Sequence, residues 1–249
     1  MFKRIFKFST VRSILGSRIF DNYYSDFIMG YCFLKKQMPA SISLIKSLHT
    51  IKIDEVKDLF TINEIFNWKI YKTPRWSEYK NIVDIGANIG CASIFLCELV
   101  DVKRLVAIEP NAKVIETLKY NIKKNIKGVD IEIIEAAIAK TSGAQDFFVS
   151  DSSRYSALIK SASFNYIEKT SVDCIDFETL LTYFSKMEPN STLIKIDIEG
   201  VEKDFFSYLE KQDEYIGDIV VEGEDLPSEF GAYVCQTKKF KDVYYYTKK

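Results

Sequence analysis

Histidine is almost missing from this chain of 249 residues, because His49 is the only one. This scarcity argues against a metal site built on histidine and against most catalytic triads that use an imidazole base. The five cysteines form no C-x-x-C pair, and their number is odd. Such cysteines are typical of free thiols in a reducing cytosol, so we expect a cytoplasmic protein.

Long apolar runs are also lacking, and none reaches the length that a membrane-spanning helix needs. The net charge of -1 carries no signature of nucleic-acid binding, and we expect no nucleic-acid partner. The charge is nevertheless uneven. Residues 1–80 hold 14 Lys and Arg against 7 Asp and Glu, whereas residues 81–249 hold 20 against 28. Because residues 1–20 contain basic but no acidic side chains, one hypothesis is that they contact an anionic membrane surface.

The hydrophobic pattern divides the chain into an N-terminal helical extension, residues 1–50, and one domain, residues 51–249. From residue 81 on, short apolar strands alternate with helical patterns, which is typical of a doubly wound parallel sheet. The pattern predicts strands at 81–85, 104–109, 130–135, 192–198 and 217–222, and helices at 89–100, 112–125, 176–186 and 201–210. It also predicts a β-hairpin insertion with strands at 143–150 and 156–159, and a last edge strand around 244–246.

The first strand ends in the most informative segment of the chain, IVDIGANIG at residues 82–90. An apolar strand with a carboxylate, Asp84, is followed by a glycine turn, which lets a nucleotide-like ligand approach the backbone. About twenty residues later the second strand ends in Glu109. An acid at this place in such folds binds the hydroxyl groups of a ribose. The two segments together predict a nucleoside cofactor.

Two other cofactor motifs are missing. A dinucleotide fingerprint, G-x-G-x-x-G from Gly86, would need glycines where Asn88 and Cys91 stand. A P-loop string, G-x-x-x-x-G-K-[ST], does not occur either. A nucleoside ligand without a pyrophosphate remains, and S-adenosylmethionine fits this description.

These motifs resemble the FkbM family of S-adenosylmethionine-dependent methyltransferases. The resemblance covers VDIGANIG (83–90), AIEPN (107–111) and, most specifically, KIDIEGVE (195–202) in the fourth strand. It implies a Rossmann-like class I methyltransferase sheet of about seven strands, doubly wound and mostly parallel. It also implies O-methylation, commonly of sugars or secondary metabolites.

The resemblance further implies roles for single residues. Those that match the cofactor turn are Asp84, Gly86, Asn88 and Gly90, and Glu109 matches the ribose-binding acid. Glu135 and Ala136 stand at the positions that usually contact the edge of the adenine ring. The acidic string at the mouth of the fourth strand matches at Asp197, Glu199 and Glu202.

Lys195, Asp197 and Glu199 are spaced by two, so on a strand they project to one face. Asp197 stands near the carboxyl end of that strand, where open α/β sheets bind ligands. We predict Asp197 as the base or acceptor-orienting carboxylate and Lys195 as its ion-pair partner. Two alternatives stay open: Asp197, Glu199 and Glu202 bind a divalent cation, which we do not expect, or Glu199 and Glu202 only favour the next helix N-terminus.

The leading hypothesis is therefore an S-adenosylmethionine-dependent methyltransferase that acts on a hydroxyl of a sugar, glycan or glycoconjugate precursor. Its partner would be a small-molecule or carbohydrate acceptor. An NAD(P)-dependent oxidoreductase on a similar sheet is the alternative, disfavoured by Asn88 and Cys91 and by the shortage of histidine. A non-catalytic cofactor-binding scaffold is a third hypothesis, against which Asp84, Glu109 and Asp197 speak. The sequence does not predict the oligomeric state.

Overall fold

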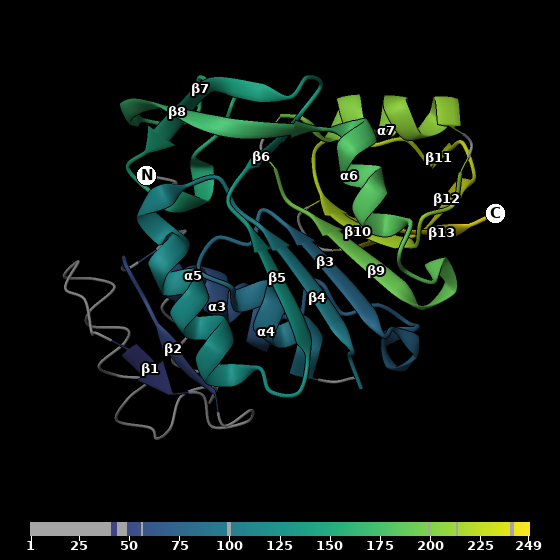
Figure 1. The fold of residues 1–249 in the computed structure, drawn as a ribbon, viewed down its shortest axis with the longest axis horizontal. Coiled ribbons are helices and arrows are strands. Elements are labelled where there is room, and N and C mark those ends of the chain that lie inside the picture. Colours follow the sequence, from purple (N-terminus) through teal and green to yellow (C-terminus); the bar gives the residue numbers. More distant parts are fainter. Residues whose placement is uncertain are drawn as a thin grey trace, which may run out of the picture.

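A computed structural model of the chain (Figure 1) describes residues 41–43, 49–55, 57–98, 101–198, 200–212, 214–239 and 242–249. Most of the predicted helical extension, with its basic residues 1–20, lies outside the described residues. Where the extension is described it contains strand β1 (Ser41–Ser43), which pairs antiparallel with β2 (Thr50–Lys52). The division of the chain at residue 50 stays a prediction.

The main sheet has eight strands in the order β11-β12-β13-β10-β9-β3-β4-β5. Its parallel part consists of β3 (Asn81–Ile85), β4 (Arg104–Ile108), β5 (Asp130–Ile134), β9 (Thr192–Ile196) and β10 (Asp218–Glu222). The antiparallel part consists of β11 (Glu229–Phe230), β12 (Tyr233–Lys239) and β13 (Val243–Lys248). β3 lies between β4 and β9, so the order of the strands reverses there. Ligands of doubly wound sheets bind at such a point, beside the carboxyl ends of the strands.

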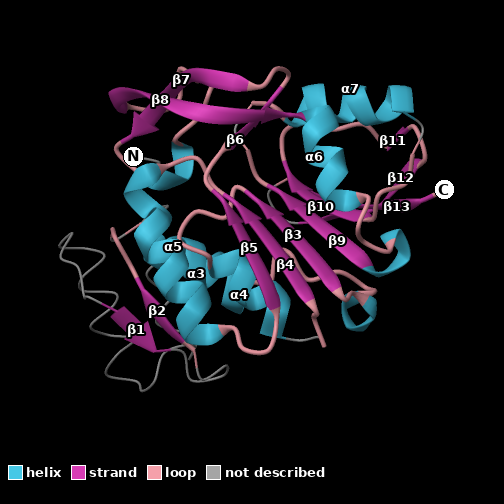
Figure 2. Cartoon of the chain, viewed as in Figure 1, coloured by secondary structure: helices cyan, strands magenta, loops and turns pink. Residues whose placement is uncertain are grey.

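Helices cover both faces of this sheet, which confirms the predicted doubly wound fold (Figure 2). One face carries α3 (Asp58–Ile62), the following π-helix η1 (Asn63–Asn67), α4 (Cys91–Glu98) and α5 (Ala112–Asn125). The other carries α6 (Phe177–Phe184) and α7 (Glu202–Gln212). Within β3, Ile82 packs into the first hydrophobic cluster, whereas Val83 and Ile85 pack into the second. Both faces of the strand are therefore buried, which explains why its sequence does not alternate between apolar and polar residues.

Two of these helices begin at side-chain caps that the sequence provides. The side chain of Asn111 accepts a hydrogen bond from the backbone N–H of Lys113 at the start of α5. Asp176 accepts one from the N–H of Thr179 at the start of α6. Each cap satisfies a backbone donor that the first turn of a helix leaves unpaired.

The predicted insertion is a separate three-stranded sheet of β6 (Ala137–Ala139), β8 (Tyr166–Asp176) and β7 (Gly143–Ser150). The prediction of a second hairpin strand at 156–159 was wrong. Ala157 forms only an isolated bridge with Phe148, and the partner of β7 is β8. Most side chains of β8 before Cys174 are exposed or half-buried. The strand therefore lacks the apolar alternation from which a strand can be predicted.

The last strand predicted around residues 244–246 is present, but the prediction that it lies at the edge of the sheet was wrong. This segment belongs to β13, which lies inside the sheet between β10 and β12. Tyr244, Tyr245 and Tyr246 are all buried. The edge is instead formed by the two-residue strand β11, and such a short edge offers little backbone to another chain.

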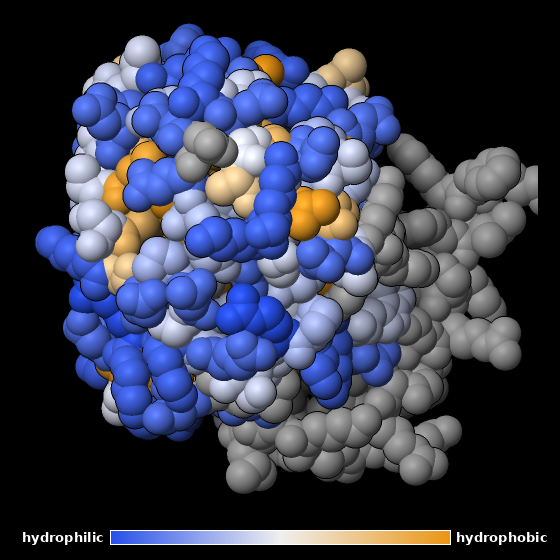
Figure 3. All heavy atoms as spheres, turned by 90° about the vertical axis from the view of Figure 1, so that its right-hand side faces the viewer, coloured by the Kyte–Doolittle hydropathy of each residue, from blue (hydrophilic) through white to orange (hydrophobic). Residues whose placement is uncertain are grey.

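The face near the C-terminus is mainly hydrophilic. Figure 3 shows polar side chains over the side near the C-terminus, with apolar side chains in separate spots. Within the described part of the chain, none of the helices has the length and hydrophobicity that crossing a bilayer requires. The described cysteines, Cys91, Cys97, Cys174 and Cys235, are free thiols.

A buried carboxylate, Asp218, joins the amino end of β10 to the segment before β3. It accepts hydrogen bonds from the hydroxyls of Tyr79 (2.7 Å), Tyr245 (2.8 Å) and Tyr215 (2.5 Å). Arg75 Nη1 lies 3.1 Å from its Oδ2. The side chain of Asp218 is not exposed at all, so these four partners take the place of water around its carboxylate.

Replacing Asp218 should destabilise the fold strongly. We expect Asp218→Ala to lower the free energy of unfolding by about 3–5 kcal/mol, because it leaves Arg75 and three phenols without their acceptor. Urea unfolding followed by circular dichroism measures this change. Asp146→Ala is the control, since Asp146 pairs with Lys169 at the surface and should cost less than about 1 kcal/mol. Equal effects of the two variants would contradict the proposed role of the Asp218 network.

Candidate active site

The turn after β3 is the first component of the site. Its backbone has positive φ angles at Gly86 (77°), Asn88 (48°) and Gly90 (87°). A Cβ added at Gly86 would stand 2.0 Å from the backbone oxygen of Asp197, so only glycine fits there. The predicted cofactor turn and the end of β9 are therefore in direct contact.

Glu109 follows β4 and is held against this turn. One of its oxygens accepts a hydrogen bond from the backbone N–H of Asn88, the other from that of Asn111, each at 2.8 Å. The side chain lines the cavity described below and is almost fully buried. Burial raises the pKa of Glu109 to about 7, although the two N–H groups act in the opposite direction. The remaining lone pairs of this carboxylate can accept hydrogen bonds from a ligand.

Asp84 and Lys195 form a buried ion pair behind the turn. Lys195 Nζ lies 3.1 Å from Asp84 Oδ1 and donates to the carbonyl oxygens of Gly86 (2.7 Å) and Ile85 (3.3 Å). Ser93 Oγ donates to the other oxygen of Asp84 at 2.6 Å. Burial alone would lower the pKa of Lys195, but the carboxylates of Asp84 and Asp197 outweigh it and raise that pKa. The ammonium therefore stays charged and ties the turn to β9.

Asp197 follows β9 and faces the cavity with a side chain that is 38% exposed. Its Oδ2 lies 3.6 Å from Lys195 Nζ and 3.2 Å from the hydroxyl of Tyr71. The same hydroxyl lies 3.1 Å from Oε2 of Glu222, the last residue of β10. Burial, followed by the charge on Asp197, raises the pKa of Glu222 to about 7.

These residues line a cavity of about 1070 Å³, measured with its open mouth. It lies at the carboxyl ends of β3, β4, β9 and β10, where the strand order reverses, and the insertion covers one side of it through residues 153–158. Its lining holds four carboxylates against two cations, namely Glu64, Glu109, Asp197 and Glu222 against Arg154 and Lys195. With these acids ionised, the cavity is negative overall and favours a cationic ligand over an anionic one.

The insertion is fixed to the segment before β3 by polar contacts. Glu55 Oε1 accepts hydrogen bonds from the hydroxyl of Ser152 (2.7 Å) and from the backbone N–H of Ser153 (3.0 Å). Arg154 Nη2 donates to Glu64 at 2.8 Å, and its guanidinium lies over the ring of Phe60. These contacts hold the cover of the cavity in place.

The structure brings most of the predicted site residues together, but not all. Gly86, Asn88, Glu109, Ala136, Lys195 and Asp197 line the cavity. Asp84 and Gly90 do not line the cavity. Asp84 pairs with Lys195 next to the turn, and Gly90 lies close to Leu118 of α5. Glu135 does not line the cavity: it is half exposed and forms an ion pair with Lys119 at 2.6 Å. His49 lies apart from the cavity as well, 3.9 Å from Glu98.

The acidic string after β9 is only partly described, because Glu199 lies outside the described residues. Glu202 begins α7, and its Oε2 accepts a hydrogen bond from the backbone N–H of Gly200 at 3.0 Å. This contact fits the alternative in which Glu202 favours the helix N-terminus. In the part of the chain that the structure describes, no three His, Cys, Asp or Glu side chains are grouped to hold a metal ion.

Sequence reasoning missed Glu222, Glu64 and Arg154, and it considered Tyr71 only for packing or for stacking on a sugar face. A signal existed for Glu222, because it ends the strand predicted at 217–222 as Glu109 ends the second strand. Nothing comparable marked Tyr71, which lies in a turn before the first strand and is separated from Asp197 by 126 positions.

The chain matches the family model described as the methyltransferase FkbM domain over residues 84–246, well over half of its length. No curated protein matches it. It is similar to the solved structure of a proposed methyltransferase from Escherichia coli, with 14% identity over 81% of this chain and 93% of that one and a TM-score of 0.45. It is similar to that of a methyltransferase from Geobacter sulfurreducens, with 12% identity over 73% of this chain and 77% of that one and a TM-score of 0.42. It is also similar to M. jannaschii TYW2 in complex with AdoMet, with 14% identity over 84% of each chain and a TM-score of 0.38. At these TM-scores the three likenesses carry no conclusion about the ligands of this chain.

Proposed function

Because the chain belongs to the FkbM methyltransferase family, we propose that it transfers a methyl group from S-adenosylmethionine to a hydroxyl of a sugar, glycan or glycoconjugate precursor. The observation that carries this proposal is the cavity itself. It combines the glycine turn, a strand-end acid at Glu109 and the carboxylate of Asp197 in one negatively charged space.

The residues present fit this methyl donor. Gly86 lets the turn pack against the backbone of Asp197, and this turn lines the cavity, where a ligand can lie against it. Glu109 is placed to accept hydrogen bonds from ribose hydroxyls. Ala136 would border the adenine. The excess of carboxylates favours a sulfonium cation, whereas the pyrophosphate of NAD(P) would bring two negative charges into a negative cavity. The same charges therefore speak against the oxidoreductase alternative.

When bound, S-adenosylmethionine supplies an activated methyl group that leaves its sulfur as the acceptor oxygen attacks. Asp197 would orient the acceptor hydroxyl and take its proton, because it is the partly exposed carboxylate at the end of β9. Lys195 would pair with the carboxylate of Asp197, from which its ammonium lies 3.6 Å away. The walls of the cavity would restrict the acceptor to few orientations.

Hydroxyl acceptors suit this lining. The carboxylates of Asp197 and Glu222 accept hydrogen bonds, and the hydroxyl of Ser153 can donate or accept one. A sugar offers several hydroxyls to such a set.

The test of the proposed function is calorimetric titration of the full chain with S-adenosylhomocysteine, NAD and NADP. We expect micromolar binding of S-adenosylhomocysteine alone. Binding of a nicotinamide cofactor instead would overturn the proposed donor, and binding of none of the three would favour the scaffold alternative.

Replacing Glu109 should weaken donor binding. We expect Glu109→Gln to raise the Kd for S-adenosylhomocysteine about 10–100-fold, because hydrogen bonds to a charged acceptor contribute about 1.5–3 kcal/mol. Since the pKa of Glu109 is raised to about 7, a ligand that binds the ionised form should bind more weakly as the pH falls below 7. Calorimetry at pH 6, 7 and 8 measures both effects.

Glu116→Gln is the matched control, because Glu116 lies on the exposed side of α5. It should leave both the affinity and its pH dependence as in the wild type. An unchanged Kd in Glu109→Gln would show that the ribose is bound elsewhere.

A further inference from the structure

One phenol in the cavity contacts two carboxylates at once. The hydroxyl of Tyr71 lies 3.2 Å from Asp197 Oδ2 and 3.1 Å from Glu222 Oε2. All three side chains line the cavity. They come from three different segments: the turn before β3, the end of β9 and the end of β10. Tyr71 also lies outside the residues that match the family model, which begin at Asp84.

When both acids are ionised, this group of three side chains holds one hydrogen, which is too few for hydrogen bonds along both contacts. A phenol carries one hydrogen and can donate it to only one carboxylate. The second short contact needs a hydrogen on the other acid. Because the pKa of Glu222 is raised to about 7, Glu222 is the acid that holds this hydrogen near neutral pH. In that protonated form Glu222 donates to Tyr71 while Tyr71 donates to Asp197, whereas the ionised form of Glu222, which gains population as the pH rises, accepts the hydrogen of Tyr71.

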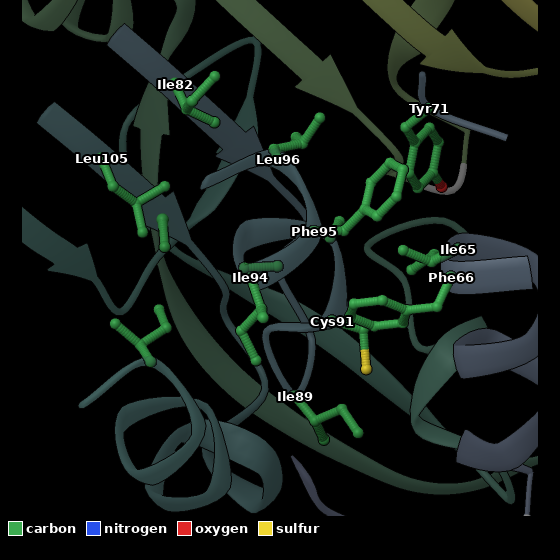
Figure 4. Close-up of a cluster of buried hydrophobic side chains, with 14 of the residues drawn as sticks. Ile65, Phe66, Tyr71, Ile82, Ile89, Cys91, Ile94, Phe95, Leu96 and Leu105 are labelled. Carbon is green, nitrogen blue, oxygen red and sulfur yellow. The ribbon is translucent and has the colours of Figure 1, made fainter. Parts of the chain in front are cut away.

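The position of Tyr71 is fixed on both sides of its ring. The ring belongs to the hydrophobic cluster that also contains Ile65, Phe66 and Phe95 (Figure 4). The ammonium of Lys195 lies 5.5 Å from the ring centre. The residue is almost fully buried, so its hydroxyl stays directed at the two carboxylates.

We propose that Tyr71 connects Asp197 to Glu222 as a proton relay, in which Glu222 finally holds the proton that the acceptor hydroxyl loses. The inference rests on the proposed function. The step starts from the form in which Glu222 is ionised and accepts the hydrogen of Tyr71. The acceptor oxygen loses one proton to Asp197, Asp197 passes one to the oxygen of Tyr71, and Tyr71 passes its own hydrogen to Glu222. Asp197 and Tyr71 end as they began, and Glu222 gains one proton. Tyr71 and Glu222 thus act through Asp197 and not on the acceptor itself.

The charges around Glu222 permit this transfer in both directions. Asp197 and Glu64 raise its pKa, whereas Arg154 and the hydroxyl of Tyr71 lower it. Lys195 faces the same group from β9. An acid with a pKa of about 7 can take up and release a proton near neutral pH, as a relay needs between two turnovers.

The deciding experiment is ¹³C NMR of the full chain with labelled tyrosine Cζ and labelled glutamate Cδ. Glu109 should also titrate near pH 7, so the resonance of Glu222 is identified as the one that titrates in this range and is missing in Glu222→Gln. We also expect the Cζ resonance of Tyr71 to shift with the same midpoint, because its hydroxyl changes from donor to acceptor toward Glu222. In Glu222→Gln this shift of Tyr71 should disappear. Tyr120, which is exposed on α5, is the internal control and should show no inflection near pH 7.

A kinetic measurement adds a second readout. With labelled S-adenosylmethionine and a panel of methyl glycosides as acceptors, kcat of Tyr71→Phe should fall about 10–100-fold. The rise of kcat with pH around 7 should be lost, and the affinity for S-adenosylhomocysteine should be unchanged. Tyr120→Phe should behave as the wild type.

The relay is overturned if Tyr71 Cζ does not titrate with Glu222, or if Tyr71→Phe keeps the wild-type pH profile. Where none of the glycosides is methylated, the NMR titration alone decides. A chain that does not bind S-adenosylhomocysteine but shows the coupled titration would refute the proposed donor and leave the proton-sharing group intact.

Discussion

Asp197→Asn should lower the rate of methyl transfer about 10²–10⁴-fold and leave the affinity for S-adenosylhomocysteine nearly unchanged. The amide has the size of the carboxylate and can still accept a hydrogen bond from Tyr71, but it cannot take a proton. General base catalysis contributes a factor of this size. The thioether ligand is uncharged at sulfur, so the lost charge should affect its binding little. The measurement is the transfer of labelled methyl to an acceptor at saturating donor.

Asp173→Asn is the control for this variant, since Asp173 is exposed on β8 and does not line the cavity. Transfer by Asp197→Asn within about twofold of the wild type would refute the assignment of the base. An equal loss of rate and of S-adenosylhomocysteine affinity would point to a disturbed turn at Gly86, which contacts the backbone of Asp197.

The parts of the site that follow from local sequence were predictable. Gly86 and Glu109 stand at the ends of continuous apolar strands, and the carboxyl ends of neighbouring parallel strands meet at one edge of a sheet. Position along the chain therefore fixed their place in space. The α/β fold and the parallel strands followed in the same way from the apolar pattern.

Contacts between distant segments were not predictable in this way. Tyr71 reaches Asp197 only because the turn before β3 folds back over the carboxyl ends of the strands. β8 lacked an apolar face, and β13 entered the sheet interior through pairing with β10, which no local pattern specifies. Glu135 was placed in the site because it follows the third strand, but its side chain pairs with Lys119 outside the cavity.

Lys195 makes one contact that the sequence predicted and others that it did not. Its spacing to Asp197 suggested a shared face of the strand, and its contact with Asp197 agrees. Its shorter contacts, however, are with Asp84 and with the carbonyl oxygens of the turn. The ammonium therefore acts first on the shape of the cofactor turn and only second on the charge of Asp197.

Lys195→Met should therefore destabilise the whole domain. The variant keeps the length of the side chain but leaves the fully buried carboxylate of Asp84 without its cation. Loss of one partner of a buried pair costs about 3–5 kcal/mol, and in a chain of this size the melting temperature should fall by roughly 6–20 °C. Urea unfolding and thermal melts measure the two quantities. S-adenosylhomocysteine should also bind more weakly, because the carbonyl groups of Ile85 and Gly86 lose their common donor.

A double variant separates the ion pair from general damage to the core. In Asp84→Asn/Lys195→Met no unpaired charge remains, and we expect it to be more stable than Lys195→Met alone by about 0.5–3 kcal/mol. Lys169→Met is the matched control, since Lys169 pairs with Asp146 at the surface, and should cost less than about 1 kcal/mol. A double variant less stable than Lys195→Met would show that the ammonium stabilises the turn carbonyls rather than Asp84, and that the carboxylate has other sufficient partners.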